Sequence, residues 1–163
     1  MSPRAASRLE SLRFSRVFDY VAGEADWLAF ALPTEGTKTD QPRAGPVTRV
    51  DVPTCRLTDW LSDVRDKVRA AGWESCIVVN ERGVVLGRVR GDALEGHSAR
   101  TAEEVMRAGP ATVRPNEPLG SLVQRMRNRN VDSIVVTTPD GVLVGVLRRT
   151  DAERRLEQQE TTI

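Results

Sequence analysis

The residues best suited to binding chemistry lie close together near the C-terminal end of the chain. Arg148, Thr150 and Asp151 fall within four positions of one another. A carboxylate at the start of a helix can accept both hydroxyl protons of a cis-diol, while the free N–H groups of that helix end and a nearby guanidinium favour phosphate oxygens. These residue types are therefore compatible with a small ligand that carries both a diol and a phosphate.

The same residues also have an ordinary structural interpretation. Asp is a favoured N-cap residue, so Asp151 could do no more than cap its helix. Arg148 and Arg149 follow a predicted strand and could lie at a solvated sheet edge, where strand alternation would point only one of them inward. The residue types alone leave both interpretations open.

Chemistry that needs a nucleophile or a metal is not indicated. Cys55 and Cys76 have no acid–base partner nearby in the sequence, and we expect them to be small buried thiols. His97 is the only histidine and is predicted to lie in a loop, and one histidine cannot build a His-rich metal centre. We therefore expect neither catalysis nor a bound metal.

Composition limits the class of protein and its partners. The chain has 163 residues, of which 39% are hydrophobic and 29% charged, which is typical of a globular protein with a core. The formal net charge of +1 removes the electrostatic argument for nucleic acid or a membrane surface as a partner. Two cysteines are too few for a disulfide scaffold, and no apolar run indicates a signal peptide or an anchor. These features predict a cytoplasmic protein.

An internal duplication organises the body of the chain. Gly87 aligns with Gly145 at an offset of 58 residues, and the register holds without a gap from Pro53 to Glu95. Chance does not explain matches that fall at turn glycines and at the buried phase of each predicted element. Identical pairs at this offset include Thr54 and Thr112, Arg56 and Arg114, Ser75 and Ser133, Gly83 and Gly141, and Glu95 and Glu153.

Each copy is predicted to contain the same elements in the same order. A short strand precedes an amphipathic helix, which is followed by a buried strand, a glycine turn, a second strand and a closing helix that begins near Asp92 or Asp151. One copy of this size cannot seal its sheet alone, so we expect the two copies to pack sheet against sheet about a pseudo-twofold axis. The expected strands are 53–56, 75–79 and 84–89 in the first copy and 111–114, 133–136 and 142–147 in the second.

Two tryptophans of the first copy have no aromatic counterpart in the second. Trp60 aligns with Pro118, and Trp73 aligns with Val131. In a chain with only 4% aromatic residues, we expect such side chains to bury large apolar area in the core or at a dimer interface.

The region before the body is predicted to consist of an arm and a linker. Residues 33–46 contain three prolines, two glycines and no large apolar side chain, which is typical of a linker. Residues 17–33 are expected to form a short strand, a glycine turn and a helix that carries Trp27. This stretch resembles the last strand and helix of a rhodanese-type sulfurtransferase domain. The active-site Cys of that fold would lie upstream, and no Cys precedes Cys55, so sulfur transfer is not expected.

The duplicated β-α-β-β-α unit resembles a pair of cystathionine-β-synthase (CBS) domains, the arrangement called a Bateman module. Its most specific piece is the segment 141–151, a glycine-led strand that ends in Thr followed by Asp. The resemblance implies an α/β (α+β) fold in which tandem CBS repeats form one pseudo-twofold module, preceded by a short strand–helix arm. The implied boundaries are 1–46 for the arm and linker, 47–98 for the first repeat, 99–157 for the second repeat and 158–163 for a C-terminal tail.

The resemblance also implies a ligand and the residues that bind it. In the family an Asp at the position of Asp151 holds the ribose diol of an adenosine ligand, and the preceding hydroxyl and nearby basic groups face its phosphates. In the first repeat, Ala93 stands at that position and Asp92 lies one residue away, so the implied first-repeat site is weaker. The implied second-repeat site comprises Thr112, Asp132, Ser133, Ile134, Arg148, Thr150 and Asp151, and the weaker site comprises Thr54, Ser75, Arg90 and Asp92.

Two functional hypotheses follow. In the first, the protein is a regulatory homodimer that binds AMP, ADP or ATP, requires no cofactor, catalyses no reaction, and signals to an unidentified protein partner through a population shift in its packing. In the second, it is a ligand-free module for dimerisation and protein interaction, and Asp151 only caps a helix. The family's usual proline in the middle strand is replaced by Ile77 and Val135, which favours the second hypothesis.

Overall fold

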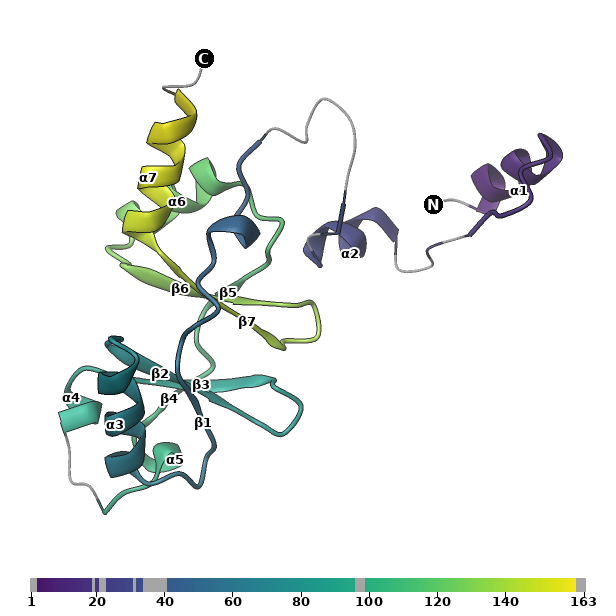
Figure 1. Cartoon of the computed structure of the whole chain (residues 1–163). Helices are drawn as coiled ribbons and strands as arrows, with labels where there is room; N and C mark the ends of the chain where they lie inside the picture. Colours follow the sequence, from purple (N-terminus) through teal and green to yellow (C-terminus); the bar gives the residue numbers. More distant parts are fainter. Residues whose placement is uncertain are drawn as a thin grey trace.

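The two copies of the duplication fold into two α/β units with the same order of elements (Figure 1). The computed structural model describes residues 3–18, 20, 23–30, 32–33, 41–95 and 99–160. The predicted fold class and element order of the two copies are confirmed. The first unit contains β1 (Thr54–Cys55), α3 (Leu61–Ala70), β2 (Ser75–Val79), β3 (Val85–Arg90) and α4 (Asp92–Glu95). The second unit contains β5 (Thr112–Val113), α6 (Leu119–Asn128), β6 (Ser133–Thr137), β7 (Leu143–Arg148) and α7 (Arg149–Glu160).

The strand register repeats with the sequence. In each unit the first strand is parallel to the second, and the second is antiparallel to the third. Ser75 pairs with Arg90 in the first sheet, and Ser133 pairs with Arg148 in the second. Both hairpins also have a register shift at the same point, after Val78 and after Val136. Residues 58 positions apart in the sequence therefore also occupy equivalent positions in the two sheets.

Each sheet is extended by the chain segment that leads into the other unit. The connection between the units contains α5 (Ala102–Val105) and β4 (Arg107–Ala108), and β4 pairs with β3, so that Arg88 lies opposite Arg107. In the second unit, Arg49 and Val146 exchange two backbone hydrogen bonds of 2.9 Å before the chain crosses to the first unit. The repeat therefore extends upstream of Pro53, the start that the sequence alignment predicts.

These crossing segments explain why glycine is present at positions 87 and 145, which align in the two copies. A Cβ atom at Gly87 would overlap Met106 Sδ, and a Cβ atom at Gly145 would overlap the carbonyl oxygen of Arg49. At Gly145, only glycine lets the crossing backbone approach this closely.

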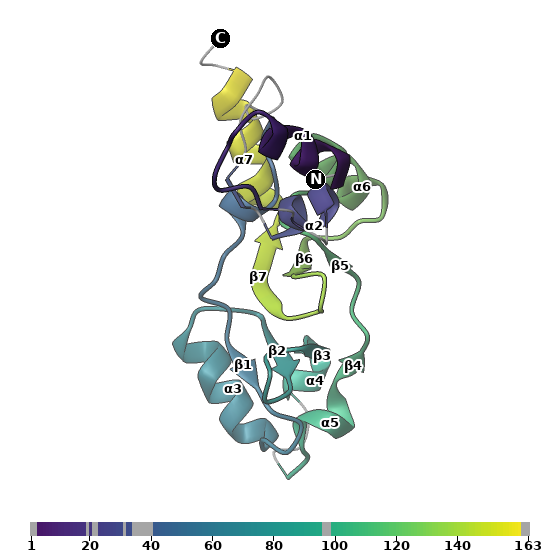
Figure 2. The same ribbon diagram turned by 90° about the vertical axis from the view of Figure 1, so that its right-hand side faces the viewer.

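The hairpins of the two units meet at the pseudo-twofold axis (Figures 1 and 2). Val85 N donates to Gly141 O at 3.0 Å, and Leu143 N donates to Gly83 O at 2.9 Å. Both turn glycines have positive φ angles, of +76° at Gly83 and +79° at Gly141. The two copies therefore contact each other through equivalent backbone atoms.

The helices bury their apolar stripes against the sheets. In the first unit, Leu61, Val64 and Val68 of α3 are buried, and the core of this unit also includes Val135 and Val146 of the second. The sheets therefore pack against each other, as the sequence predicts. Cys55 and Cys76 are buried and unpaired, as expected. The second unit has its own core below α6, made by Leu119, Leu122, Val123, Met126, Val136 and Leu147.

Part of the predicted linker packs against the second unit. Ala44 is fully buried, its N–H donates to Glu117 O at 2.9 Å, and Gly45 N donates to Pro115 O at 2.8 Å. A short 3₁₀ helix, η1 (Gly45–Val47), follows. Residues 34–40 of the predicted linker and the predicted loop around His97 lie outside the described residues.

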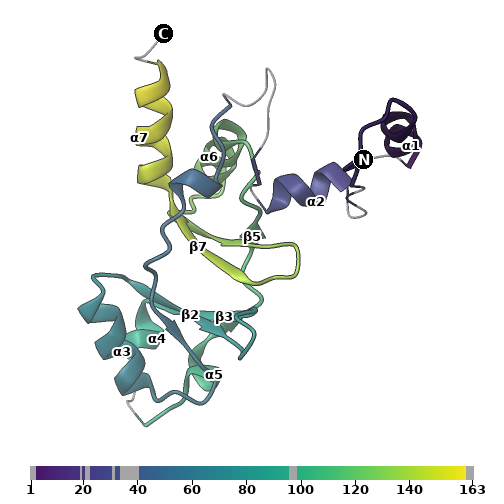
Figure 3. The ribbon, with the colours of Figure 1, turned by 45° about the vertical axis from the view of Figure 1, so that its right-hand side comes forward.

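The N-terminal arm contains α1 (Pro3–Ser11) and α2 (Gly23–Ala29), which project beside the second unit (Figure 3). The predicted helix around Trp27 is confirmed, and Trp27 Nε1 donates to Pro33 O at 2.8 Å. The predicted strand before it is wrong for the described residues, because Val17, Phe18 and Tyr20 have no strand conformation. Instead, Tyr20 packs edge-on against the Trp27 ring.

Candidate functional site

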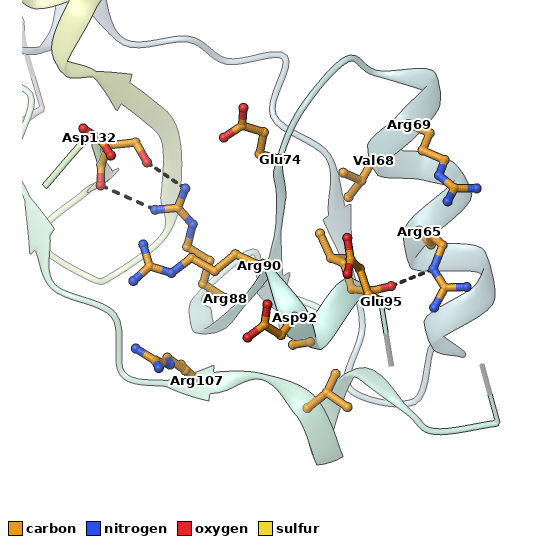
Figure 4. A pocket seen from close by; sticks show the side chains of 15 residues that line it. Arg65, Val68, Arg69, Glu74, Arg88, Arg90, Asp92, Glu95, Arg107 and Asp132 are labelled. Carbon is orange, nitrogen blue, oxygen red and sulfur yellow. Dashed lines mark hydrogen bonds between the residues drawn. The ribbon is translucent and has the colours of Figure 1, made fainter. Parts of the chain in front are cut away.

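A cavity of about 910 Å³ lies on the α4 side of the molecule and is lined by both units. Figure 4 shows Arg88, Arg90 and Arg107 gathered on one side of it, with Asp92 beside them. A second cavity, of about 400 Å³, shares these three arginines with the first and reaches Val131 and the end of α6. We call the two adjoining cavities the cleft.

Arg88 joins the two units at the wall of the cleft. Its Nη2 donates to Ser75 Oγ at 2.9 Å and to Ser133 Oγ at 2.8 Å, and Ser75 and Ser133 are equivalent residues of the two copies. Its Nε is buried and has no hydrogen-bond partner. Burial lowers the pKa of Arg88, and the neighbouring charge of Arg90 lowers it further. The equivalent residue in the second copy is Val146, so the pseudo-symmetry is broken here.

Three arginines of the cleft share one face of the first sheet. Arg88 and Arg90 are two residues apart on β3 and therefore point to the same side, and Arg107 lies directly opposite Arg88 on β4. Like charges directly opposite each other destabilise a sheet. Among the described residues, none of these three arginines forms an ion pair with a carboxylate. This arrangement favours an anion that binds between them.

The carboxylates of the cleft are placed around this cluster. Asp92 is the first residue of α4 and is exposed to the cavity. Asp132 forms an ion pair with Arg149 at 2.6 Å, although its own side chain is 82% exposed. Asp92 is thus the carboxylate at a helix start that could accept the two hydroxyl protons of a diol.

The pseudo-symmetric side of the molecule, around Arg148, is filled by Trp73. The indole is only 7% exposed, and the Cζ atoms of Arg148 and Arg49 lie 4.1 Å and 5.5 Å from its ring centre. Arg49 also donates from Nε and Nη2 to the two carboxylate oxygens of Asp51, at 3.0 Å and 2.6 Å. These hydrogen bonds lower the pKa of Asp51 from 3.8 to about 2. Both arginines on this side therefore have partners within the chain.

We call the side with the cleft the open side and the side occupied by Trp73 the filled side. Two residue differences between the copies distinguish them. Arg148 and Arg49 are the equivalents of Arg90 and Arg107, so the same two cations are present on both sides. The equivalent of Trp73 is Val131, which lines the cleft, and the equivalent of Asp51 is Gly109. The open side therefore keeps the cations but lacks the flat ring and the carboxylate that engage their equivalents.

The structure divides the residues predicted for the second-repeat site. Asp132, Ser133 and Ile134 line the cleft, together with Arg90 and Asp92 of the site predicted to be weaker. Neither cavity is lined by Arg148, Thr150 or Asp151. Only part of the predicted set therefore lines the cleft.

The other predicted residues line neither cavity. Thr150 is exposed in the first turn of α7, and one oxygen of Asp151 lies 3.7 Å from Arg154 Nη1 while the other is buried without a hydrogen-bond partner. Thr54 and Thr112 are exposed on β1 and β5 and line neither cavity. Ser75 is buried and bonded to Arg88.

Arg88, Arg107 and the position of Trp73 beside Arg148 were not predicted from the sequence. A signal was present for Trp73, because the alignment pairs it with Val131. Its assignment to the core is correct as far as burial is concerned, but the residue also fills the space that the smaller Val131 leaves open.

Some kinds of site have no counterpart in the part of the chain that the structure describes. No three His, Cys, Asp or Glu side chains gather there in a way that could hold a metal. Of the described helices, none has the length and apolar character needed to cross a membrane.

Comparison with known proteins gives a family match within the second half of the chain. Residues 102–157 match the CBS domain. The CBS domains of a transcriptional regulator from Streptococcus pneumoniae have a similar structure, with a TM-score of 0.66 and 24% identity over 71% of this chain and 99% of that one. A comparison with curated protein sequences found no match.

Two further similar structures were determined with a nucleotide bound. CBSX2 in complex with AMP gives a TM-score of 0.65 at 16% identity, covering 72% of this chain and 98% of that one. The cytosolic domain of the Mg²⁺ channel MgtE in complex with ATP gives 0.65 at 19% identity, covering 80% of this chain and 53% of that one. The fold is that of a CBS pair. The resemblance of residues 17–33 to a rhodanese domain is not supported, because the described part of that stretch lacks the strand and the CBS match lies elsewhere.

Proposed function

We propose that this CBS pair is a regulatory protein that binds an adenosine-containing ligand of the AMP, ADP or ATP class in the cleft. The observation that carries the proposal is the group of Arg88, Arg90 and Arg107 facing a cavity lined by both units, without a carboxylate ion pair among the described residues. Guanidinium groups bind phosphate oxygens through paired, charge-assisted hydrogen bonds. A phosphorylated ligand would supply the missing negative charge.

The remaining walls of the cleft suit the other parts of a nucleotide. Asp92 would accept hydrogen bonds from the ribose hydroxyls, and its position at the start of α4 leaves its oxygens accessible. Val131 and Ile134 offer apolar surface to a base, and the backbone of Asp132 and Ser133 offers hydrogen-bonding groups. The nucleotides bound in two similar structures, AMP in CBSX2 and ATP in MgtE, support this ligand class.

A ligand in the cleft would contact both units and therefore affect how they pack. Arg88 already links β2, β3 and β6, and the cleft lies beside this link. Binding would favour one packing of the units within a homodimer, and a protein partner in the cytoplasm would recognise that packing. In this role the chain needs no cofactor and performs no reaction.

The test is calorimetric titration of AMP, ADP and ATP into protein that has been verified to be free of nucleotide. Wild type should bind at least one of them, and Asp92→Asn and Arg107→Ala should each weaken binding at least tenfold. Asp151→Asn is the matched control, because Asp151 lines neither cavity, and its affinity should equal that of wild type. Loss of binding in Asp151→Asn but not in Asp92→Asn would move the site to the other side.

The second candidate function is a ligand-free module for dimerisation and protein interaction. The observation that favours it is Trp60, whose side chain is 53% exposed at the start of α3. Large exposed aromatic side chains commonly anchor protein contacts. If none of the three nucleotides binds to the verified apo protein, this function replaces the first.

A further inference from the structure

The filled side of the molecule has the chemistry of an occupied ligand site. Arg148 stacks on a flat aromatic ring at 4.1 Å, and the neighbouring Arg49 is paired with a carboxylate at 2.6 Å. A ring stacked on a guanidinium and an anion held by a second guanidinium are the two contacts that a nucleotide makes with such a pair. Here both groups belong to the chain itself, in Trp73 and Asp51.

The open side has the same cations and lacks both of these groups. Arg90 and Arg107 are equivalent to Arg148 and Arg49 by sequence offset and by strand register, because Arg107 pairs with β3 as Arg49 pairs with β7. Val131 and Gly109 stand in place of Trp73 and Asp51, and the cleft extends over Val131. The internal ring and anion are thus missing on the side where a cavity is present.

We infer that Trp73 and Asp51 are a built-in substitute for a ligand, which closes a latent second site for an aromatic anion and limits the chain to one external ligand. The latent site, formed by Arg49 and Arg148, would accept a nucleotide once the indole and the carboxylate are removed. The inference rests on the proposed function only for the choice of nucleotide as a probe.

The decisive experiment changes the filled side into the open one. Trp73→Val with Asp51→Gly copies the residues of the other half, and calorimetry with ATP would count the bound molecules per chain. We expect one in wild type and two in the double variant. Trp73→Phe is the matched control: it keeps a ring on Arg148 and should keep a count of one. A folded double variant that binds no more ATP than wild type overturns the inference.

The reciprocal change, Val131→Trp, tests the open side without removing a buried side chain from the core. Val131→Trp should place an indole in the cleft and weaken ATP binding at least tenfold, whereas Val131→Leu, which adds no flat ring, should weaken it much less. Near-ultraviolet circular dichroism and thermal unfolding would establish that each variant is folded. Unchanged ATP affinity in folded Val131→Trp would contradict the inference.

The outcomes also separate this inference from the proposed function. If wild type binds no ATP and the double variant binds one molecule, the latent site is real and the cleft is not an ATP site. If wild type binds one and the double variant still binds one, the cleft is the site and Trp73 is only part of the core. If neither protein binds ATP, the inference fails, and the proposed function fails with it only when AMP and ADP also do not bind to wild type.

Discussion

Ser75 and Ser133 share one nitrogen atom of Arg88, although they lie 58 residues apart and in different repeats. The two serines begin the middle strands β2 and β6, so this nitrogen lies where the two sheets meet. A single side chain on one repeat therefore ties equivalent points of both. Arg88 has no equivalent arginine in the second repeat, where Val146 takes its place, yet it binds equivalent serines of both repeats.

Replacing Arg88 should loosen the contact between the repeats. Arg88→Ala leaves the hydroxyl groups of Ser75 and Ser133 without their donor, and hydrogen bonds to a charged group contribute about 2 kcal/mol each before the cost of burying the guanidinium is subtracted. We expect a net loss of about 1–2 kcal/mol in the free energy of unfolding, measured with urea. A variant as stable as wild type would show that burial of the charge cancels the hydrogen bonds.

Removing one of the neighbouring arginines should have the opposite effect on the apo protein. Arg107 lies opposite Arg88 with a like charge, so Arg107→Ala should raise the free energy of unfolding by about 0.5 kcal/mol. Added salt should stabilise wild type more than the variant, because salt screens this repulsion. The measurement is thermal unfolding at about 0.05 M and about 0.5 M salt. Equal salt responses in the two proteins would mean that the arginines do not repel each other appreciably.

The two kinds of glycine in the second repeat should respond differently to alanine. In Gly145→Ala the new methyl group would overlap the carbonyl oxygen of Arg49, and we expect a loss of about 2–3 kcal/mol. Gly120→Ala is the matched control, because Gly120 lies in α6 with open space around it and should gain about 0.5–1 kcal/mol from helix propensity. Denaturant unfolding measures both, and similar effects of the two changes would refute the role of the crossing segment.

Acid should weaken the contact between Arg49 and Asp51. The hydrogen bonds from Arg49 lower the folded-state pKa of Asp51 from 3.8 to about 2, so the ionised carboxylate contributes stability above pH 3.8, and this contribution is lost as the pH falls toward 2. In Asp51→Asn this part of the acid dependence should be absent, and the effect should be small because the pair is exposed. Unfolding temperatures between about pH 6 and pH 2 test this, and parallel profiles for the two proteins would contradict it.

The elements of the fold could be predicted because their signals are local. Leu61, Val64 and Val68 recur at helical spacing, and Gly83 and Gly141 mark the turns of hairpins that the structure contains. Because the sequence of the body repeats at a fixed offset, each of its elements could be predicted twice, once in each copy. The strand predicted around Val17 had no such second copy to support it, and it is the one that the structure contradicts.

The lining of the cleft, our candidate site, could be predicted only in part because it comes from both repeats. Grouping residues by copy placed Asp132 and Ser133 with Asp151, whereas contact between the sheets places them with Arg90 and Asp92. Whether a cavity is present on each side depends on the size of one side chain. Trp73 packs beside Arg148 on one side, whereas the smaller Val131 lines a cavity on the other. The positions of these two side chains depend on tertiary packing, which cannot be predicted from spacing along the chain.

The exchange of edge segments between the repeats has a consequence for folding. The strand partner of β7 is Arg49, near the start of the first repeat, and the partner of β3 is β4, near the start of the second. A fragment that begins after either segment would expose an unpaired sheet edge, which promotes aggregation. The two repeats should therefore unfold in a single cooperative transition, and neither should be separable as an autonomous folding unit.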